Sequence, residues 1–492
     1  MPTSAGLRVN QAAGRWVLFT TSLGLTMALL DSTAVNVALP HIGEDFGAGL
    51  AQLQWTANAY MLTLAALILL GGSLGDRFGR RRIFVAGMTL FALASLLCGL
   101  APDSETLITA RALQGVGGAL LTPGSLAIIQ SSFHPEDRAR AVGLWSGLGG
   151  VGAAVGPFLG GWLADGPGWR WVFLVNLPIA AIGIPVALRH VPESKAALDR
   201  HRFDIAGAFL GAIALGLLTY ALIETDWLTG VLGVFAAAWF VRAERRHEAP
   251  MLPLSLFRSR QFTVINGVTL LVYAAFGGFF FLATLQLQIA ARYSALAAGA
   301  AMLPTTLLML LLSGRAGSLG ERIGPRLPLT AGSLLSVCGM LLMMRAGANA
   351  DYVSRVLPAL LVLGTGMVTL VAPLTATVLA SVDTSRAGIA SGVNNATARA
   401  AGLIAVAALP LLTGMQADSY QSAETFAATF DQAMLWCAGL LVVAAMISYT
   451  QLGRGHAGTP AAPAPDSRMH CAITAPPLDP GPVNTGLAGT TT

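Results

Sequence analysis

The stretch that decides the fold is Gly72-Ser73-Leu74-Gly75-Asp76-Arg77-Phe78-Gly79-Arg80-Arg81. It lies between two long apolar runs, and its glycines and charged side chains predict a sharp turn between two membrane helices. The pattern returns in the second half as Gly317-Ser318-Leu319-Gly320-Glu321-Arg322-Ile323-Gly324-Pro325-Arg326, with seven of ten residues identical. One basic turn could belong to any membrane protein. Two copies predict a duplicated helix bundle, which is a transporter architecture with the site between the copies.

The composition is that of a membrane protein. Hydrophobic residues make up 54% of the chain and charged residues only 11%, against roughly 25% charged residues in soluble domains. Apolar runs long enough to cross ~30 Å of hydrocarbon recur along the chain. Fourteen spans are predicted, at about 16–38, 55–75, 82–101, 105–129, 139–163, 170–190, 204–223, 227–243, 262–288, 295–315, 327–346, 355–380, 387–412 and 432–451.

The repeat also predicts how these spans are grouped. The turn with Asp76 follows the second span and the turn with Glu321 follows the tenth, so a second six-helix bundle begins at the ninth span. The predicted fold class is all-α and integral to the membrane, with two six-helix bundles related by a pseudo-two-fold axis and two inserted helices. The predicted parts are a disordered cytoplasmic tail at 1–14, bundles at 15–190 and 257–451, an inserted pair at 203–243, and a disordered cytoplasmic tail at 452–492.

Basic residues predict the orientation. Of the 29 Lys and Arg residues, 23 fall in the tails and in the loops on one side of the predicted membrane. Two more lie within spans, and the opposite loops hold only Arg170, Arg292, Arg345 and Arg355. The positive-inside rule then places both termini in the cytoplasm and the chain in the cytoplasmic membrane. These loops explain the net charge of +5, so we expect no nucleic-acid partner.

Catalysis, metal binding and nucleotide-driven pumping are disfavoured. Cys98, Cys338 and Cys437 lie singly in separate spans and Cys471 lies in the tail, so no metal-ligand spacing exists. The histidines lie in loops, in tails or, for His190, at a span end. No Gly-x-x-x-x-Gly-Lys-Ser/Thr loop occurs. We therefore expect no enzyme, no metal and no cofactor, with the proton gradient as the energy source.

Asp31 is the one acidic residue that the predicted spans place well inside the membrane, and Arg111 of the fourth span lies at a matching depth. At 1.5 Å per residue, both are roughly 10 Å below the outer boundary. A lone charge in hydrocarbon costs at least ~2.5–3.5 kcal/mol on insertion scales, so the two residues form a predicted proton-coupling site. The alternative is an aspartate wetted from the outer loop, and Arg399 of span thirteen is a rival partner.

A stripe of small residues runs along the fifth span. Gly152, Gly156 and Gly160 recur every four residues beside Pro157, which predicts close packing, a bend and a sliding contact between the two bundles. Such stripes are common in membrane helices, so this prediction depends on the duplicated bundles that the repeated turn indicates.

Aromatic and polar side chains predict a cavity for bulky apolar cargo. Its candidate lining residues are Asn36, Tyr273, Phe276, Gln286 and Arg399. Ordinary packing against lipid explains most of the aromatic residues of the ninth span equally well.

Asp76 is predicted to latch the inner side closed. Its loop, with Gly72, Arg77, Gly79 and Arg80, lies at the same membrane face as the start of span thirteen. A carboxylate near a helix N-terminus gains ~0.3–1 kcal/mol. The alternative is a surface ion pair between Asp76 and a neighbouring arginine.

These motifs together resemble the major facilitator superfamily, and in particular its fourteen-helix drug:proton antiporter branch. The matching stretches are the first-span motif at 30–40, the turn at 72–84, the fourth-span motif at 111–115, the glycine motif at 152–161, and the stretches at 169–178 and 387–392.

The resemblance implies a proton-coupled antiporter that exports drugs, antibiotics or other organic compounds by alternating access. Asp31 and Arg111 would handle the proton, the Asp76 loop would gate the inner face, and the glycine stripe would favour antiport. The expected partners are a small organic substrate, protons and membrane lipid, and the chain is expected to act as a monomer. The alternatives are transport of a nutrient, endogenous metabolite or lipid by the same fold and, more distantly, a membrane sensor.

Overall fold

The computed structural model describes residues 6–195, 204–247, 250, 252–348, 350–383, 386–415 and 422–453. Within these ranges the regular structure is helical, apart from one isolated bridge between Leu7 and Phe133. Fourteen of the helical segments there are long and apolar enough to cross a membrane, which confirms the predicted number of spans. Most of the two predicted disordered tails lies outside the described residues, but residues 12–14 already belong to the first helix.

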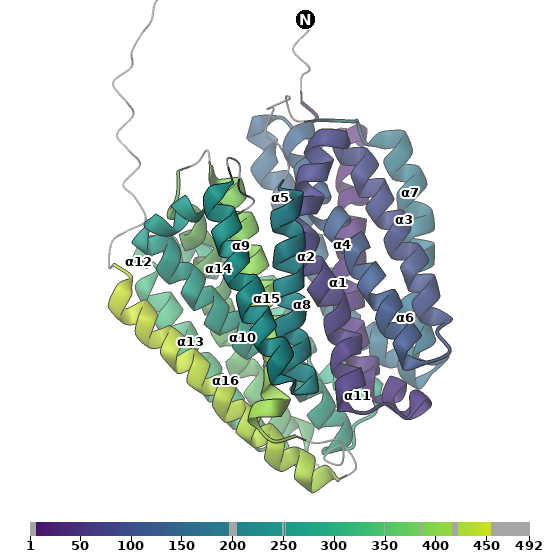
Figure 1. Cartoon of the computed structure of the whole chain (residues 1–492), viewed down its shortest axis with the longest axis vertical. Coiled ribbons are helices and arrows are strands. Elements are labelled where there is room, and N and C mark those ends of the chain that lie inside the picture. Colours follow the sequence, from purple (N-terminus) through teal and green to yellow (C-terminus); the bar gives the residue numbers. More distant parts are fainter. Residues whose placement is uncertain are drawn as a thin grey trace, which may run out of the picture.

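The chain forms two groups of helices with a pair between them (Figure 1). The first group is α1 (Ala12–Phe46), α2 (Leu50–Phe78), α3 (Arg80–Gly99), α4 (Ser104–Ser132), α5 (Pro135–Asp165), α6 (Arg170–Leu174) and α7 (Asn176–His190). The inserted pair is α8 (Ile205–Glu224) and α9 (Trp227–Arg246). The second group is α10 (Arg260–Ile289), α11 (Ala295–Ala301), α12 (Leu303–Ile323), α13 (Arg326–Met343), α14 (Leu357–Ala380), α15 (Ala387–Leu412) and α16 (Ala423–Gln451). Short turns precede α10 at Leu254–Arg258 and α14 at Tyr352–Val356.

The two bundles repeat one pattern of neighbours. In the first bundle α4 packs against α2 and α3, and α1 packs against α5 and α7. In the second, α14 packs against α12 and α13, and α10 packs against α15 and α16. The contacts between bundles also correspond, because α5 lies against α11 and α2 lies against α15. A pseudo-two-fold axis between the bundles produces this correspondence.

The repeated turn has a glycine with positive φ in both copies. Gly79, between α2 and α3, has φ of 116°, and Gly324, between α12 and α13, has φ of 78°. Residues with a side chain rarely adopt such angles, so glycine is required at both junctions. The repeat therefore marks the same helix–helix corner in each bundle.

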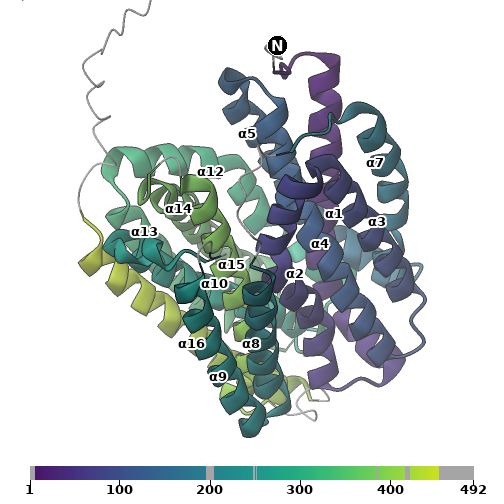
Figure 2. The same ribbon diagram turned by 45° about the horizontal axis from the view of Figure 1, so that its top comes forward.

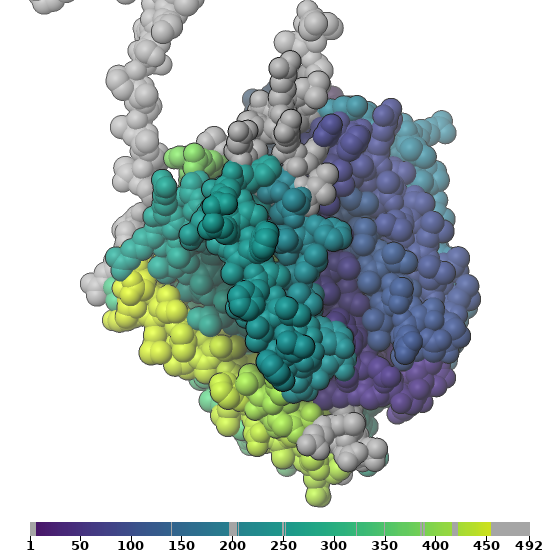
Figure 3. Space-filling model, in the orientation of Figure 1, coloured from purple at the N-terminus to yellow at the C-terminus, as the bar shows by residue number. Residues whose placement is uncertain are grey.

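The inserted pair covers one seam between the bundles. α8 and α9 pack against each other, and α8 also contacts α2 of the first bundle and α15 of the second. Figure 3 shows this pair, in teal, across the face of the molecule where the two bundles meet.

We call the end of the molecule at which α1 begins the inner end, and the opposite end the outer end. Hydrogen bonds join the two bundles at the outer end. The Asp165 carboxylate accepts from the backbone N–H groups of Ala295 and Leu296 at 3.1 and 2.8 Å. The Gln54 amide donates to the Val406 carbonyl at 2.7 Å. Toward the inner end, near the N-terminus, the ribbons of the two bundles diverge (Figure 2).

Several helices extend beyond the predicted spans, and one predicted span is divided into two helices. α16 begins at Ala423, so Asp431 lies inside the helix, and α9 includes the buried Glu244. Both acids lie in helical turns beyond the predicted spans 227–243 and 432–451, because an apolar run marks only the part of a helix that crosses hydrocarbon. That Asp31 is the one acid well inside a span stays a prediction. The predicted span at 170–190 is divided at Val175 into α6 and α7.

Candidate functional site

Asp31 on α1 and Arg111 on α4 form an ion pair inside the first bundle. The Asp31 Oδ2 atom lies 2.5 Å from Nη1 of Arg111. The Asp31 side chain is fully buried and that of Arg111 is 2% exposed. Sequence reasoning placed both residues at one depth, and the packing of α1 against α4 brings them together.

Amide and hydroxyl groups complete the surroundings of the Asp31 carboxylate. Its Oδ1 atom accepts hydrogen bonds from the side-chain amides of Gln114, at 2.7 Å, and Asn176, at 3.0 Å. Both amides also donate to the Ser95 hydroxyl, at 2.8 and 3.2 Å. The ionised carboxylate is thus held by one guanidinium and two amides contributed by α4 and α7.

Arg111 is held from its other sides as well. Its Nε atom donates to the Thr56 carbonyl of α2 at 3.1 Å, and Nη1 donates to Gln114 at 2.7 Å. The guanidinium carbon lies 4.6 Å from the centre of the Tyr60 ring and 5.7 Å from that of Phe173. Such cation–π contacts favour a desolvated guanidinium.

The pair is therefore a neutral, hydrogen-bonded unit that connects the helices of the first bundle. Breaking a buried pair by removing one partner costs about 3–5 kcal/mol, because an uncompensated charge remains. In this arrangement no oxygen of Asp31 is free of a donor, so uptake of a proton there requires the donors to rearrange.

A cavity of about 510 Å³ lies between the bundles next to this pair. Arg111 lines it, as does Ser32, the neighbour of Asp31. The apolar part of its lining is rich in aromatic and methionine side chains from α2, α10, α12 and α14, namely Met61, Tyr273, Phe276, Phe280, Phe281, Met309 and Met367. This volume is typical of small-molecule sites, which occupy roughly 300–1,000 Å³.

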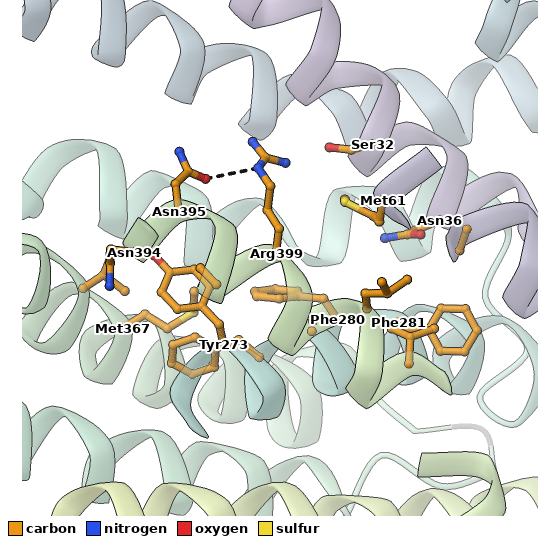
Figure 4. Close-up of a pocket in the computed structure, with 18 of the residues that line it drawn as sticks. Ser32, Asn36, Met61, Tyr273, Phe280, Phe281, Met367, Asn394, Asn395 and Arg399 are labelled. Carbon is orange, nitrogen blue, oxygen red and sulfur yellow. Dashed lines mark hydrogen bonds between the residues drawn. The ribbon is translucent and has the colours of Figure 1, made fainter. Parts of the chain in front are cut away.

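Four of the five predicted cavity residues line this space: Asn36, Tyr273, Phe276 and Arg399. Arg399 projects from α15 toward the middle of the cavity, and its Nε atom donates to Asn395 at 3.1 Å (Figure 4). Ser32 and Asn36 lie across from it on α1 (Figure 4).

Gln286 is not part of the cavity. Its side chain is fully buried, and its amide donates to the Ala346 carbonyl at 2.8 Å. The prediction that it lines the cavity is wrong, because the helical turn carries residue 286 to the face of α10 that packs inside the second bundle.

The Asp76 loop makes its described contacts within the first bundle. Asp76, at the end of α2, accepts from Arg80, at the start of α3, at 2.8 Å, and the Asp76 side chain is about half exposed. The Arg81 backbone N–H donates to Glu193 at 3.1 Å, which fastens the turn to the chain beyond α7. The described partner of Asp76 is thus a neighbouring arginine, and the predicted contact of this loop with the start of α15 stays a prediction. Residues 384 and 385, just before α15, lie outside the described part.

The glycine stripe of α5 faces α1 of its own bundle. A Cβ on Gly160 would lie 2.6 Å from the Ala34 carbonyl oxygen, and one on Gly152 would lie 2.6 Å from Thr26. The prediction that this stripe forms the contact between bundles is wrong for these glycines. The other face of α5 makes that contact, since a Cβ on Gly161 would clash with the Ala295 carbonyl oxygen. Pro157 belongs to this second face, where its carbonyl oxygen would clash with a Cβ on Gly299.

Sequence reasoning missed Ser95, Gln114 and Asn176, the neutral polar residues around the ion pair. A signal existed for Gln114, which lies three residues after Arg111 and hence on the same helix face. Asn176 directly follows the break between α6 and α7, and the apolar run that contains it hides that break.

The described residues form two similar bundles of candidate membrane-spanning helices and an inserted pair, fourteen spans together, with a cavity between the bundles beside a buried ion pair. This arrangement defines a multi-pass membrane transporter. A family model described as the Major Facilitator Superfamily matches residues 21–407. The chain belongs to the Major Facilitator Superfamily, and it is a transporter rather than an enzyme.

Three relatives illustrate the likeness in sequence. The multidrug resistance protein Stp of Mycobacterium tuberculosis is 38% identical over 77% of this chain and 72% of its own length. The puromycin resistance protein of Streptomyces alboniger is 34% identical over 88% and 90% of the two chains. The probable actinorhodin transporter of Streptomyces coelicolor is 36% identical over 81% and 72%.

Solved structures show the same fold at low sequence identity. A bacterial homologue of the human lysosomal transporter Spinster has a TM-score of 0.65 and 16% identity, over 89% of this chain and 97% of that one. The peptide transporter POT has a TM-score of 0.66 and 16% identity, over 91% and 98%.

Proposed function

We propose that this protein exports small organic compounds from the cytoplasm in exchange for protons. It would act by alternating access in the plasma membrane, with the inner end and both termini in the cytoplasm and no cofactor beyond the proton gradient. The names of the relatives, which refer to multidrug resistance, puromycin resistance and actinorhodin transport, support an organic cargo. The cationic turn at Arg77, Arg80 and Arg81 supports this orientation.

The observation that carries the proposal is the buried pair of Asp31 and Arg111 at the edge of the cavity. Every hydrogen bond donated to Asp31 stabilises the ionised form of its carboxylate. A change of conformation that moves Arg111 toward the cavity would leave Asp31 without its cation and favour proton uptake. Proton binding would then depend on the conformation, which is what coupling to a proton gradient requires.

The cavity would hold the cargo, and the contacts between bundles would control access to it. The bonds of Asp165 and Gln54 close the outer end in this structure, so the cavity would be entered from the inner end. In the opposite state Asp76 would leave Arg80 and contact the start of α15, which would close the inner end.

The test is a toxicity screen in a susceptible bacterial host, with and without expression of this chain. The proposal predicts lowered intracellular accumulation of at least one toxic organic compound in expressing cells. That difference should vanish when a protonophore collapses the proton gradient. A difference that survives collapse of the gradient would contradict proton coupling, and a compound that enters faster on expression would indicate import.

A further inference from the structure

Among the residues that the structure describes, Arg399 of the cargo cavity has no carboxylate as a counter-ion. Its side chain is partly exposed to that space, and its described hydrogen-bond partner is the neutral oxygen of Asn395 (Figure 4). A guanidinium has five donors and stays protonated in proteins. Most of its donors therefore remain open to whatever occupies the cavity.

Among the described residues that line the cavity there is no Asp or Glu. The nearby Asp31 is fully buried, and its oxygens are taken by Arg111, Gln114 and Asn176. Arg111 also reaches the cavity, but its charge is balanced by Asp31. The cavity as a whole is thus positive by one charge.

The other side chains that line the cavity indicate what kind of compound it can hold. Tyr273, Phe276 and Phe280 supply aromatic faces, and Met61 and Met367 supply flexible apolar ones. A positive site within apolar walls excludes organic cations, because it would bring like charges together in surroundings that screen them poorly.

We propose that the cavity selects organic anions, with a planar apolar body and one carboxylate, phenolate or enolate that Arg399 binds. This inference rests on the proposed export function, since it takes the cavity as the cargo site. Arg399 is a specificity-determining residue in this account. A bidentate contact of the guanidinium with the anion gives both affinity and orientation.

Two dyes with one ring system test the charge preference. Fluorescein carries a carboxylate and a phenolate, whereas a rhodamine ester presents the same xanthene rings as a cation. Equilibrium binding to the purified full-length protein in detergent, followed by fluorescence polarisation, compares them without any need for transport. Wild type should bind fluorescein at least about tenfold more tightly than the rhodamine ester, as a hydrogen bond to a charged group implies.

The variants Arg399→Gln and Arg399→Lys test whether Arg399 causes the preference for the anionic dye. Arg399→Gln should weaken fluorescein binding roughly 10- to 100-fold and leave or improve rhodamine binding. Arg399→Lys should retain part of the preference, because it keeps the charge but loses the bidentate geometry. Arg355→Gln is the matched control, since Arg355 is exposed in the turn before α14 and is not part of the cavity lining; it should bind both dyes like wild type.

Three results would overturn the inference. They are equal binding of the two dyes by wild type, absence of saturable fluorescein binding, and equal loss of both dyes in Arg399→Gln. The comparison of the two dyes in the wild-type protein tests the inference even if a variant fails to fold. Fluorescein that binds selectively but is not moved across proteoliposomes would support the anion site and contradict export, so the two proposals fail separately.

Discussion

At the scale of single residues, the account depends on the charge balance between Asp31 and Arg111. Hydropathy predicted both positions, because an ionisable residue within an apolar run is conspicuous in a sequence. It could not predict Gln114 and Asn176, which bind the carboxylate, or Ser95, which accepts from both amides, because neutral polar residues are common in membrane helices. Their roles depend on how four helices pack around one point.

Because Asp31 and Arg111 neutralise each other, replacing both should destabilise the protein less than replacing Arg111 alone. Arg111→Gln leaves the Asp31 carboxylate buried without its cation and should destabilise the protein by about 3–5 kcal/mol. Adding Asp31→Asn removes the charge and should recover most of that loss. Thermal unfolding of the purified proteins measures both effects, and losses that simply add would show that the two side chains do not interact in the folded state.

At the scale of helices, the close approach of α5 to α1 depends on glycine. A Cβ on Gly160 would lie 2.6 Å from a backbone oxygen of Ala34, whereas one on Gly147 would meet nothing within 4 Å. The four-residue spacing predicted a smooth face on α5. The sequence could not show which helix packs on it, because that depends on how α5 is rotated in the bundle.

Two alanine substitutions on α5 test this packing. Gly160→Ala should destabilise the protein by about 1–3 kcal/mol, because the backbone of α1 must move. Gly147→Ala is the control and should change stability little, or raise it by up to about 1 kcal/mol through helix propensity. Unfolding temperatures in detergent compare them, and equal effects at the two positions would argue against close α1–α5 contact.

Two buried acidic residues lie at one end of the inserted pair, where Glu244 binds the segment that leads to α10. Asp204 caps α8 by accepting from Gly207 N–H at 2.6 Å, and Glu244 of α9 accepts from Leu252 N–H at 2.8 Å. Both side chains are buried and approach the same point beside Gly207.

Glu244 can therefore be replaced by glutamine more safely than by alanine. Glu244→Gln keeps an oxygen for the Leu252 N–H and adds an amide donor near Asp204. Glu244→Ala leaves the Leu252 N–H without its acceptor and should cost about 1–3 kcal/mol. Thermal unfolding ranks the variants, and a glutamine variant as unstable as the alanine one would contradict this role.

At the scale of the whole molecule, two bundles are joined at one end and diverge at the other. The repeated turn and the hydropathy predicted two bundles and fourteen spans, because both signals are local. The partner of Asp76 could not be predicted, since the sequence places both a neighbouring arginine and the start of α15 on the same side of the membrane. Here it pairs with Arg80.

Alternating access predicts that fixing the outer contact stops export. Asp165 and Leu296, which meet at 2.8 Å across the bundles, can be replaced by cysteines in a background without the four native ones. Oxidation should trap this state and abolish export, and a reductant should restore it. Asp165→Cys alone is the control, and full export by the cross-linked protein would contradict opening at this end.

The central claim is that the carboxylate of Asp31 couples proton entry to cargo export. The direct measurement is proton flux into sealed proteoliposomes, read from an internal pH-sensitive dye, while a transported compound moves the opposite way. The account predicts that wild type exchanges the two and that folded Asp31→Asn protein still binds the compound but moves no protons with it. Undiminished compound-dependent proton flux in Asp31→Asn would contradict the account.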